Sequence, residues 1–320
     1  MTIAVMGSGA FGTGLAISLC QNGPTTLWGR DTDAVVEMKK RRENHLRLPG
    51  FALPKTLLVT SDIHDVQGAT QLLVAVPMQK LRGFLTTYAE ILDGKQVIAC
   101  CKGIELSTGL GPVSVIREIL PNATPMILTG PSFAADIAKG LPTALTLACA
   151  DTAAAKRSQN ALSTSSLRIY RTADTIGAEL GGAIKNVIAI ACGAVMGAGL
   201  GESARAALMT RGYAEMQRLA EHLGAEVATL AGLSGLGDLA LTCTSTQSRN
   251  YRLGETIGRG ETFDPAVTVE GAATSLAVNA IANRNNLDLP ITAAVADLLE
   301  NRLDVVSAIA TLLSRPLKEE

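Results

Sequence analysis

Two patterns of apolar residues divide the chain. In the first half, short apolar runs such as QLLVAVP, QVIACCKG, PMILTGPS and TALTLACA alternate with helix-like segments such as MQKLRGFLTTYAEIL and LGPVSVIREIL. This alternation predicts a parallel sheet with helices on both faces. After the strand SLRIYRTAD the strand signals stop, and apolar or small residues recur at helical spacing, as at Met209, Gly212, Met216, Leu219 and Leu223. We therefore expect a doubly wound α/β domain over residues 1–174 and an all-α C-terminal domain over residues 175–320.

The first predicted turn carries a glycine pattern. The segment TIAVMGSGAFGTGLAISLCQNG reads as a short strand, the loop GSGAFG and then a helix. In such a loop Gly7 allows the tight turn, Gly9 lets the backbone approach a pyrophosphate, and Gly12 lets the helix pack against the strand. The free N–H groups and the helix dipole favour an anion. The pattern predicts a Rossmann-like, dinucleotide-binding domain.

The end of the second strand bears on the choice of dinucleotide. A carboxylate at this place would hold the adenosine ribose of NAD. The strand TTLWGRD ends instead in Gly29 and Arg30, and Asp31 follows. A guanidinium can bind a 2′-phosphate, so we expect NADP or mixed use of NADP and NAD, with NADPH favoured. The alternative is that Arg30 stacks on adenine or points into solvent.

Two later strand ends also carry polar groups. Lys102 follows the run QVIACC, and Gly130 and Ser132 follow PMILT. Ligands of parallel α/β sheets bind beyond the carboxyl ends of the strands. We therefore place Lys102 near a bound anion or substrate.

One lysine stands in the most apolar helical segment. Residues 177–201 read GAELGGAIKNVIAIACGAVMGAGLG, and no carboxylate lies within four residues of Lys185 and Asn186. In one interpretation the stem of Lys185 lies along the helix surface and its ammonium reaches water. In the other, the ammonium is desolvated, gives up its proton more readily and serves as a general base.

Two further segments mix apolar and reactive residues. In GLGDLALTCTS, Asp238 and Thr242 are four residues apart and share one helix face; alternatively, Asp238 only caps this helix. In QSRNYRLG, Ser248 and Asn250 flank Arg249. A guanidinium beside two short polar groups suits a phosphate.

Composition limits the classes of partner. The formal charge of −1 and a pI near 6.3 give no basic field, which argues against nucleic acid or an anionic membrane as the main partner. The six cysteines lack metal-ligand spacing and most lie in apolar runs, as in a reduced cytosolic protein. No export signal is visible, and Val187–Gly201 is shorter than the roughly 20 residues of a membrane span. We expect a cytoplasmic protein with no metal and no membrane span.

The motifs together indicate a family. GSGAFGT, LWGR, KGIE, GPSFA, ELGGAIKNVIAIA, ARAALMTRG, AEM, GLGDLALTCTS, SRN and VEG occur in the order typical of bacterial NAD(P)-dependent glycerol-3-phosphate dehydrogenase, which the chain resembles over nearly its whole length. The resemblance implies that sn-glycerol 3-phosphate and dihydroxyacetone phosphate are interconverted by hydride transfer with Lys185 as the proton acceptor. It also implies a homodimer and a supply of glycerol 3-phosphate for phospholipid synthesis.

The resemblance further assigns ligand contacts. The phosphorylated substrate would be lined by Lys102, Gly130, Ser132, Asn186, Asp238, Thr242, Ser248, Arg249 and Asn250. The dinucleotide would contact Gly7, Gly9, Ala10, Phe11, Gly12, Arg30, Lys102, Ala134, Arg249 and Glu270. The loop that precedes Glu270 is several residues shorter than is usual in the family.

Two other functions remain as alternatives. Another two-domain dehydrogenase, acting on 6-phosphogluconate or a 3-hydroxyacyl thioester, would need different polar segments from SRN and GLGDLALTCTS. A non-catalytic dinucleotide sensor would have no use for a desolvated base, so the combination of Lys185, Asp238 and Arg249 argues against it.

Overall fold

The computed structural model describes residues 2–265 and 267–316. It contains two compact units. The first comprises the residues up to Lys102 together with Gly111–Glu179, and the second comprises Gly103–Leu110 together with the residues from Leu180 onwards. The division lies inside helix α8 (Thr175–Gly197) rather than just before it. The apolar pattern does not reveal that Gly103–Leu110 belongs to the second unit, where the buried side chain of Ile104 joins the core.

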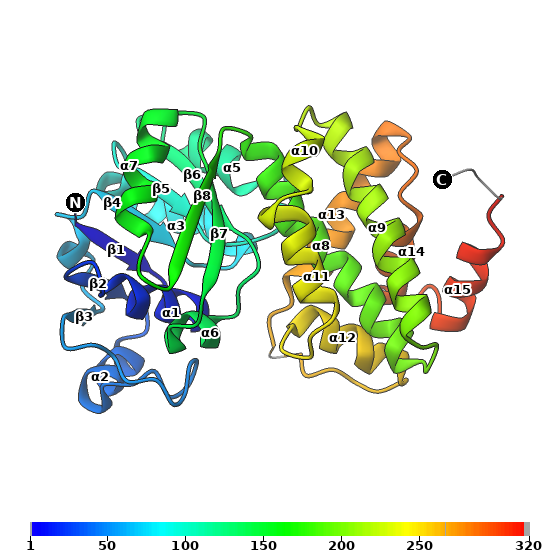
Figure 1. The fold of residues 1–320 in the computed structure, drawn as a ribbon, viewed down its shortest axis with the longest axis horizontal. Coiled ribbons are helices and arrows are strands. Elements are labelled where there is room, and N and C mark those ends of the chain that lie inside the picture. Colours follow the sequence, from blue (N-terminus) through cyan, green and yellow to red (C-terminus); the bar gives the residue numbers. More distant parts are fainter. Residues whose placement is uncertain (1, 266, 317–320) are drawn as a thin grey trace. The chain divides into compact units, whose positions relative to one another are not determined.

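The first unit is built on a sheet of eight strands among the described residues, in the order β3-β2-β1-β4-β5-β6-β7-β8. The strands are β1 (Ile3–Met6), β2 (Thr25–Trp28), β3 (Leu57–Thr60), β4 (Gln71–Val74), β5 (Gln96–Ala99), β6 (Thr124–Thr129), β7 (Thr143–Ala148) and β8 (Leu167–Thr172). The chain order reverses between β1 and β4, so right-handed crossovers place helices on both faces. The predicted doubly wound, Rossmann-like unit is confirmed (Figure 1).

The expectation of a parallel sheet is wrong at TALTLACA. Strand β7 pairs antiparallel with β6, whereas the other neighbouring strands pair parallel. The connection between β6 and β7 contains only the six-residue helix α6 (Ala134–Lys139), which at 1.5 Å per residue spans about 9 Å. Strand β6 spans about 20 Å. Helix α6 is therefore too short to return the chain to the starting edge of β6.

Helices cover this sheet. They are α1 (Ala10–Leu19), α2 (Thr32–Arg41), α3 (Met78–Thr87), α4 (Ala89–Leu92), α5 (Pro112–Ile119), α6 and α7 (Thr152–Leu162), with a 3-10 turn at Ile63–Val66. The segment expected to form one helix, MQKLRGFLTTYAEIL, divides at Tyr88 into α3 and α4. Strands β1 and β4 are buried along their whole length, as is typical of the middle of a sheet covered on both faces.

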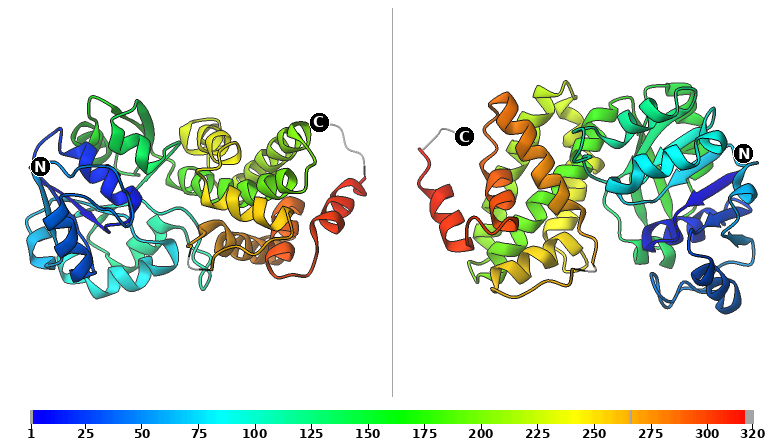
Figure 2. Two further views of the ribbon diagram at one scale, coloured as in Figure 1. Left: turned by 90° about the horizontal axis from the view of Figure 1, so that it is seen from below. Right: turned by 180° about the vertical axis from the view of Figure 1, so that it is seen from behind.

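The second unit is helical, as predicted. Beyond α8 it contains α9 (Glu202–His222), α10 (Val227–Leu230), a π turn at Leu233–Gly237, α11 (Asp238–Cys243), α12 (Arg249–Gly258), α13 (Glu270–Asn285), α14 (Pro290–Leu299) and α15 (Val305–Leu313). Side chains of α9, α11, α12 and α13 pack with those of α8 in one apolar cluster. Figure 2 shows the same helical unit in two further views.

Glycines let α8 and α12 approach closely. A Cβ at Gly193 of α8 would overlap the carbonyl oxygen of Tyr251, and a Cβ at Gly254 of α12 would overlap that of Ile190. Only glycine fits where two helix backbones touch in this way. This packing brings the polar start of α12 beside the middle of α8.

By length and composition α8 could cross a membrane. However, 89% of its most apolar window is buried inside the protein. It is the core helix of its unit, and its apolar character serves that packing.

Candidate functional site

The glycine loop has the shape that a dinucleotide requires. Gly7 has a φ of +120°, and a Cβ there would lie 2.6 Å from the carbonyl oxygen of Ala75 at the end of β4. A Cβ at Gly12 would overlap the carbonyl oxygen of Gly7, whereas a Cβ at Gly9 would meet nothing within 4 Å. The loop lies between β1 and β4, where the strand order reverses, and this is where open α/β sheets bind ligands.

The start of α1 is suited to an anion. Gly9 is its N-cap, and no side chain among the described residues caps this helix. The first turn, which includes Ala10 and Phe11, therefore presents backbone N–H groups at the positive end of the helix dipole. A loop that has no Cβ at Gly9 and has free backbone donors fits a pyrophosphate.

Arg30 and Asp31, which follow β2, differ in their contacts. Arg30 is exposed and makes no hydrogen bond or ion pair with any residue that the structure describes. The carboxylate of Asp31 accepts a hydrogen bond of 3.0 Å from the backbone N–H of Ala34 and caps α2. This contact engages Asp31 locally, which supports Arg30 as the residue that selects the cofactor.

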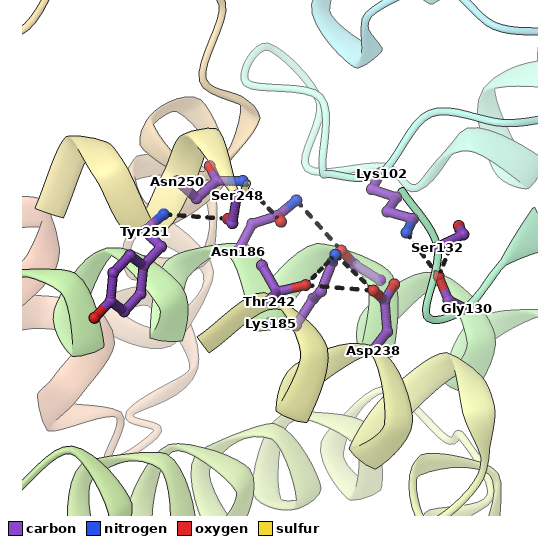
Figure 3. Close-up of polar contacts among 11 residues, drawn as sticks. Lys102, Gly130, Ser132, Lys185, Asn186, Asp238, Thr242, Ser248, Asn250 and Tyr251 are labelled. Carbon is purple, nitrogen blue, oxygen red and sulfur yellow. Dashed lines mark hydrogen bonds and ion pairs between the residues drawn. The ribbon is translucent and has the colours of Figure 1, made fainter. Parts of the chain in front are cut away.

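The predicted site residues that follow β5 and β6 meet at one carbonyl oxygen, that of Gly130. The Nζ of Lys102 donates to the carbonyl oxygen of Gly130 at 3.1 Å, and the Oγ of Ser132 donates to the same oxygen at 3.2 Å (Figure 3). Gly130 has a φ of +138°, and a Cβ there would lie 3.2 Å from the Cα of Leu145. Ala134 begins α6, and its backbone packs against Gly14 of α1.

In the helical unit Lys185 is buried and paired. Its Nζ donates to Oδ1 of Asp238 at 2.7 Å and to Oγ1 of Thr242 at 2.7 Å, and the Thr242 hydroxyl lies 3.4 Å from the same carboxylate oxygen (Figure 3). The side chain of Lys185 is 7% exposed and that of Asp238 is 1% exposed. The ammonium therefore does not reach solvent along the helix surface, so that interpretation is wrong.

The capping interpretation of Asp238 is wrong as well. Asp238 is the first residue of α11, which continues directly from the π turn, and the N-cap residue is Gly237. The carboxylate instead compensates a buried ammonium, which would otherwise be strongly unfavourable in an apolar core. Asp238 and Thr242 do share one helix face, as their spacing predicts, and both point to Lys185.

A second polar group joins three helices. The Nδ2 of Asn250 donates to Oδ1 of Asn186 at 2.8 Å (Figure 3). Oδ1 of Asn250 accepts from the N–H of Gly271 at 2.9 Å. Asn250 thus satisfies a donor in the first turn of α13, which begins at Glu270. Ser248 caps α12 by accepting from the N–H of Tyr251 at 3.2 Å.

Arg249 differs from its two neighbours. It is the first residue of α12, is exposed, and makes no hydrogen bond or ion pair within the described part of the chain. A guanidinium at the positive end of a helix dipole forms a site for a dianion. Ser248 and Asn250 hold the backbone on either side of it.

Sequence reasoning missed several buried polar residues, and two of them hold elements of the first unit. Asn44 is 4% exposed and bonds to the glycine loop, and Glu179 is 8% exposed and bonds to the N–H of Val113 at the start of α5. Their partners lie 36 and 66 residues away in the sequence. No local pattern distinguishes them from solvent-exposed polar residues.

Comparisons with known proteins agree with this architecture. Residues 2–155 match the N-terminal part and residues 174–310 the C-terminal part of the NAD-dependent glycerol-3-phosphate dehydrogenase family. Glycerol-3-phosphate dehydrogenases [NAD(P)+] of Roseobacter denitrificans and Ruegeria sp. are each 62% identical over 320 residues, covering 100% of both chains. The crystal structure of glycerol-3-phosphate dehydrogenase from Coxiella burnetii is 36% identical with a TM-score of 0.92, covering 98% of this chain and 99% of that one.

Proposed function

The chain belongs to the NAD-dependent glycerol-3-phosphate dehydrogenase family, and from this premise we propose that Lys185 carries the proton in its reaction. The enzyme interconverts sn-glycerol 3-phosphate and dihydroxyacetone phosphate with NAD(P). The observation that carries the proposal is the buried cluster of Lys185, Asp238 and Thr242. An ammonium held in an apolar core by a carboxylate and a hydroxyl is a proton donor in a fixed position.

A nicotinamide cofactor, when bound, would supply or accept the hydride at carbon 2 of the substrate. In the reducing direction the Lys185 ammonium gives its proton to the carbonyl oxygen, and the product is a secondary alcohol. In the oxidising direction the neutral amine removes the hydroxyl proton. Asp238 fixes the Nζ of Lys185 and favours its protonated form, and Thr242 holds that atom from a second side.

We assign the phosphate of the substrate to Arg249. Its guanidinium, at a helix N-terminus, has no partner among the residues that the structure describes, and charge-assisted contacts to phosphate are strong. Binding energy from the phosphate end would orient the reacting carbon. The same proposal includes the other contacts that the resemblance assigns. The substrate contacts are those of Lys102, Gly130, Ser132, Asn186, Ser248 and Asn250. The cofactor contacts are those of Ala134 and Glu270.

We assign NADPH preference to Arg30, whose guanidinium has no partner in the described part of the chain and suits a 2′-phosphate. A cytoplasmic homodimer that supplies glycerol 3-phosphate to phospholipid synthesis completes the proposal. Light scattering on the purified protein tests the dimer.

Replacing Lys185 with alanine tests the role of the lysine. We expect kcat for dihydroxyacetone phosphate, followed by NADPH absorbance, to fall by on the order of 10²–10⁴. NADPH affinity, followed by fluorescence, should change little. Small primary amines that enter the vacated space should restore part of the rate. A Lys185→Ala enzyme that keeps more than a third of wild-type kcat would rule out the lysine as proton carrier.

The same assay separates the alternative functions. A 6-phosphogluconate or hydroxyacyl dehydrogenase would not oxidise NADPH with dihydroxyacetone phosphate. A sensor would bind NADPH without turnover on any of these substrates.

A further inference from the structure

The buried side chain of Asn44 contacts the glycine loop from outside it. Asn44 lies after α2, is 4% exposed, and donates through Nδ2 to the carbonyl oxygen of Ser8 at 2.9 Å and to Oγ1 of Thr13 at 2.8 Å. Ser8 stands between Gly7 and Gly9, and Thr13 lies in the first turns of α1. One amide group therefore holds both the loop and the helix that follows it.

The segment that carries Asn44 is itself anchored. Arg42 has a φ of 51°, and its guanidinium donates to the carbonyl oxygens of Leu53, Pro54 and Leu57. The carboxylate of Glu43 accepts from the N–H of Gly50 at 2.8 Å. These contacts hold the two residues that precede Asn44, and so fix the position from which its side chain reaches the loop.

The bond to Ser8 sets the direction of the next N–H group. In a planar trans peptide the C=O and the N–H point in opposite directions, and no peptide bond of the described chain is cis. Holding the Ser8 carbonyl towards Asn44 therefore turns the Gly9 N–H away from Asn44. That N–H makes no hydrogen bond with any described residue, and a Cβ at Gly9 would meet open space.

We propose that Asn44 is a positioning residue for the dinucleotide: it fixes the Ser8–Gly9 peptide so that the Gly9 N–H is available to the pyrophosphate. Gly9 has no Cβ to restrict the rotation of this peptide on its side, so the peptide can turn unless something holds it. Asn44 does so without touching the cofactor. The inference rests on the family's dinucleotide and not on the role assigned to Lys185.

The test compares two substitutions. One removes the side-chain amide of Asn44, and the other removes the Thr13 hydroxyl, which accepts one of the two hydrogen bonds from that amide. Asn44→Leu keeps the branched shape and the number of side-chain heavy atoms but removes both bonds, to Ser8 and to Thr13, whereas Thr13→Val removes only the bond to α1. Both should lower Tm of the ligand-free protein, because each leaves a buried polar group unpaired. Only Asn44→Leu should weaken NADPH binding, by about one to two orders of magnitude in Kd, the effect of losing one charge-assisted hydrogen bond.

A second ligand separates positioning from general damage. Adenosine 2′-monophosphate lacks the pyrophosphate, so its Kd should be the same for Asn44→Leu and wild type. If Asn44→Leu does not fold, Asn44→Asp, which has the same shape but no donor, replaces it in the comparison. Equal NADPH affinity of the Asn44 and Thr13 variants, or an equal loss for both ligands, would overturn the proposal.

Discussion

At Arg249, a role in binding phosphate can be distinguished from a role in the fold. Replacing it with alanine should raise KM for dihydroxyacetone phosphate by about 10- to 100-fold, because a charge-assisted contact to phosphate contributes roughly 1.5–3 kcal/mol. Unphosphorylated dihydroxyacetone should be reduced at an unchanged rate. Arg252 is a matched control, since it is also exposed on α12 and makes no side-chain hydrogen bond within the described chain. Equal losses on both ketones would show that Arg249 supports the fold or the cofactor.

Arg30 and Asp31 are adjacent residues with different expected effects. Arg30→Asp should lower kcat/KM for NADPH by one or two orders of magnitude, because it removes an attraction of roughly 1.5–3 kcal/mol and adds a repulsion. NADH should lose less, since it has no 2′-phosphate. Steady-state kinetics with both cofactors measure the ratio.

Asp31→Ala is the control for this pair. It should lower the free energy of unfolding by about 1 kcal/mol through loss of the α2 cap and leave the NADPH/NADH preference unchanged. Damage to NADH use in Asp31→Ala, together with intact NADPH use in Arg30→Asp, would assign the selection of cofactor to Asp31.

Helix α5 begins at a buried carboxylate, and this gives the fold a pH dependence. Glu179 accepts from the N–H of Val113. Burial raises the pKa of Glu179 from 4.5 to about 7, and Asp174 adds to the rise while the Val113 N–H and Arg117 oppose it. Between pH 4.5 and about 7, Glu179 keeps its proton in the folded state but loses it in the unfolded chain. The stability that Glu179 contributes is therefore full below pH 4.5 and is lost as the pH rises through about 7.

Glu179→Gln tests this linkage because glutamine keeps the acceptor but does not titrate. Relative to the variant, wild type should lose roughly 3 kcal/mol of unfolding free energy between about pH 4.5 and pH 7. Urea unfolding at several pH values measures the difference. Glu90→Gln, an exposed position in α4, should follow the wild-type profile. A constant difference between wild type and Glu179→Gln across this range would contradict the assignment.

The contact between α8 and α12 makes a second prediction at the scale of elements. Gly254→Ala should destabilise the protein by about 1–3 kcal/mol, because the added methyl overlaps the backbone of Ile190. Alanine otherwise favours a helix over glycine. Gly83→Ala in α3, where a Cβ meets nothing within 4 Å, should instead stabilise by about 0.5–1 kcal/mol. Thermal unfolding of the two variants should show Tm shifts of opposite sign.

For the whole molecule, local patterns predicted the elements better than their long-range contacts. The glycine loop, the alternating first half and the helical second half follow from residues close together in sequence. The reversal of β7 depends on the length of a connection, and the pairing of Lys185 with Asp238 joins residues 53 positions apart. A single sequence carries no direct signal for such contacts. Asn44 and Glu179 escaped notice for the same reason.

The buried cluster of Lys185, Asp238 and Thr242 also bears on the stability of the whole molecule. Removing one partner leaves an unpaired charge in the core, so Asp238→Ala should lower the free energy of unfolding by about 3–5 kcal/mol. Replacing both charges with apolar residues of similar volume is often neutral or stabilising. The double variant Lys185→Met/Asp238→Leu should therefore unfold at or above the wild-type Tm and yet have no measurable reduction of dihydroxyacetone phosphate. Calorimetry and the NADPH assay on the same samples measure both properties. A double variant as unstable as Asp238→Ala would show that the ion pair supports the fold; a stable, inactive one would show that the helical core tolerates these charges for the chemistry they perform.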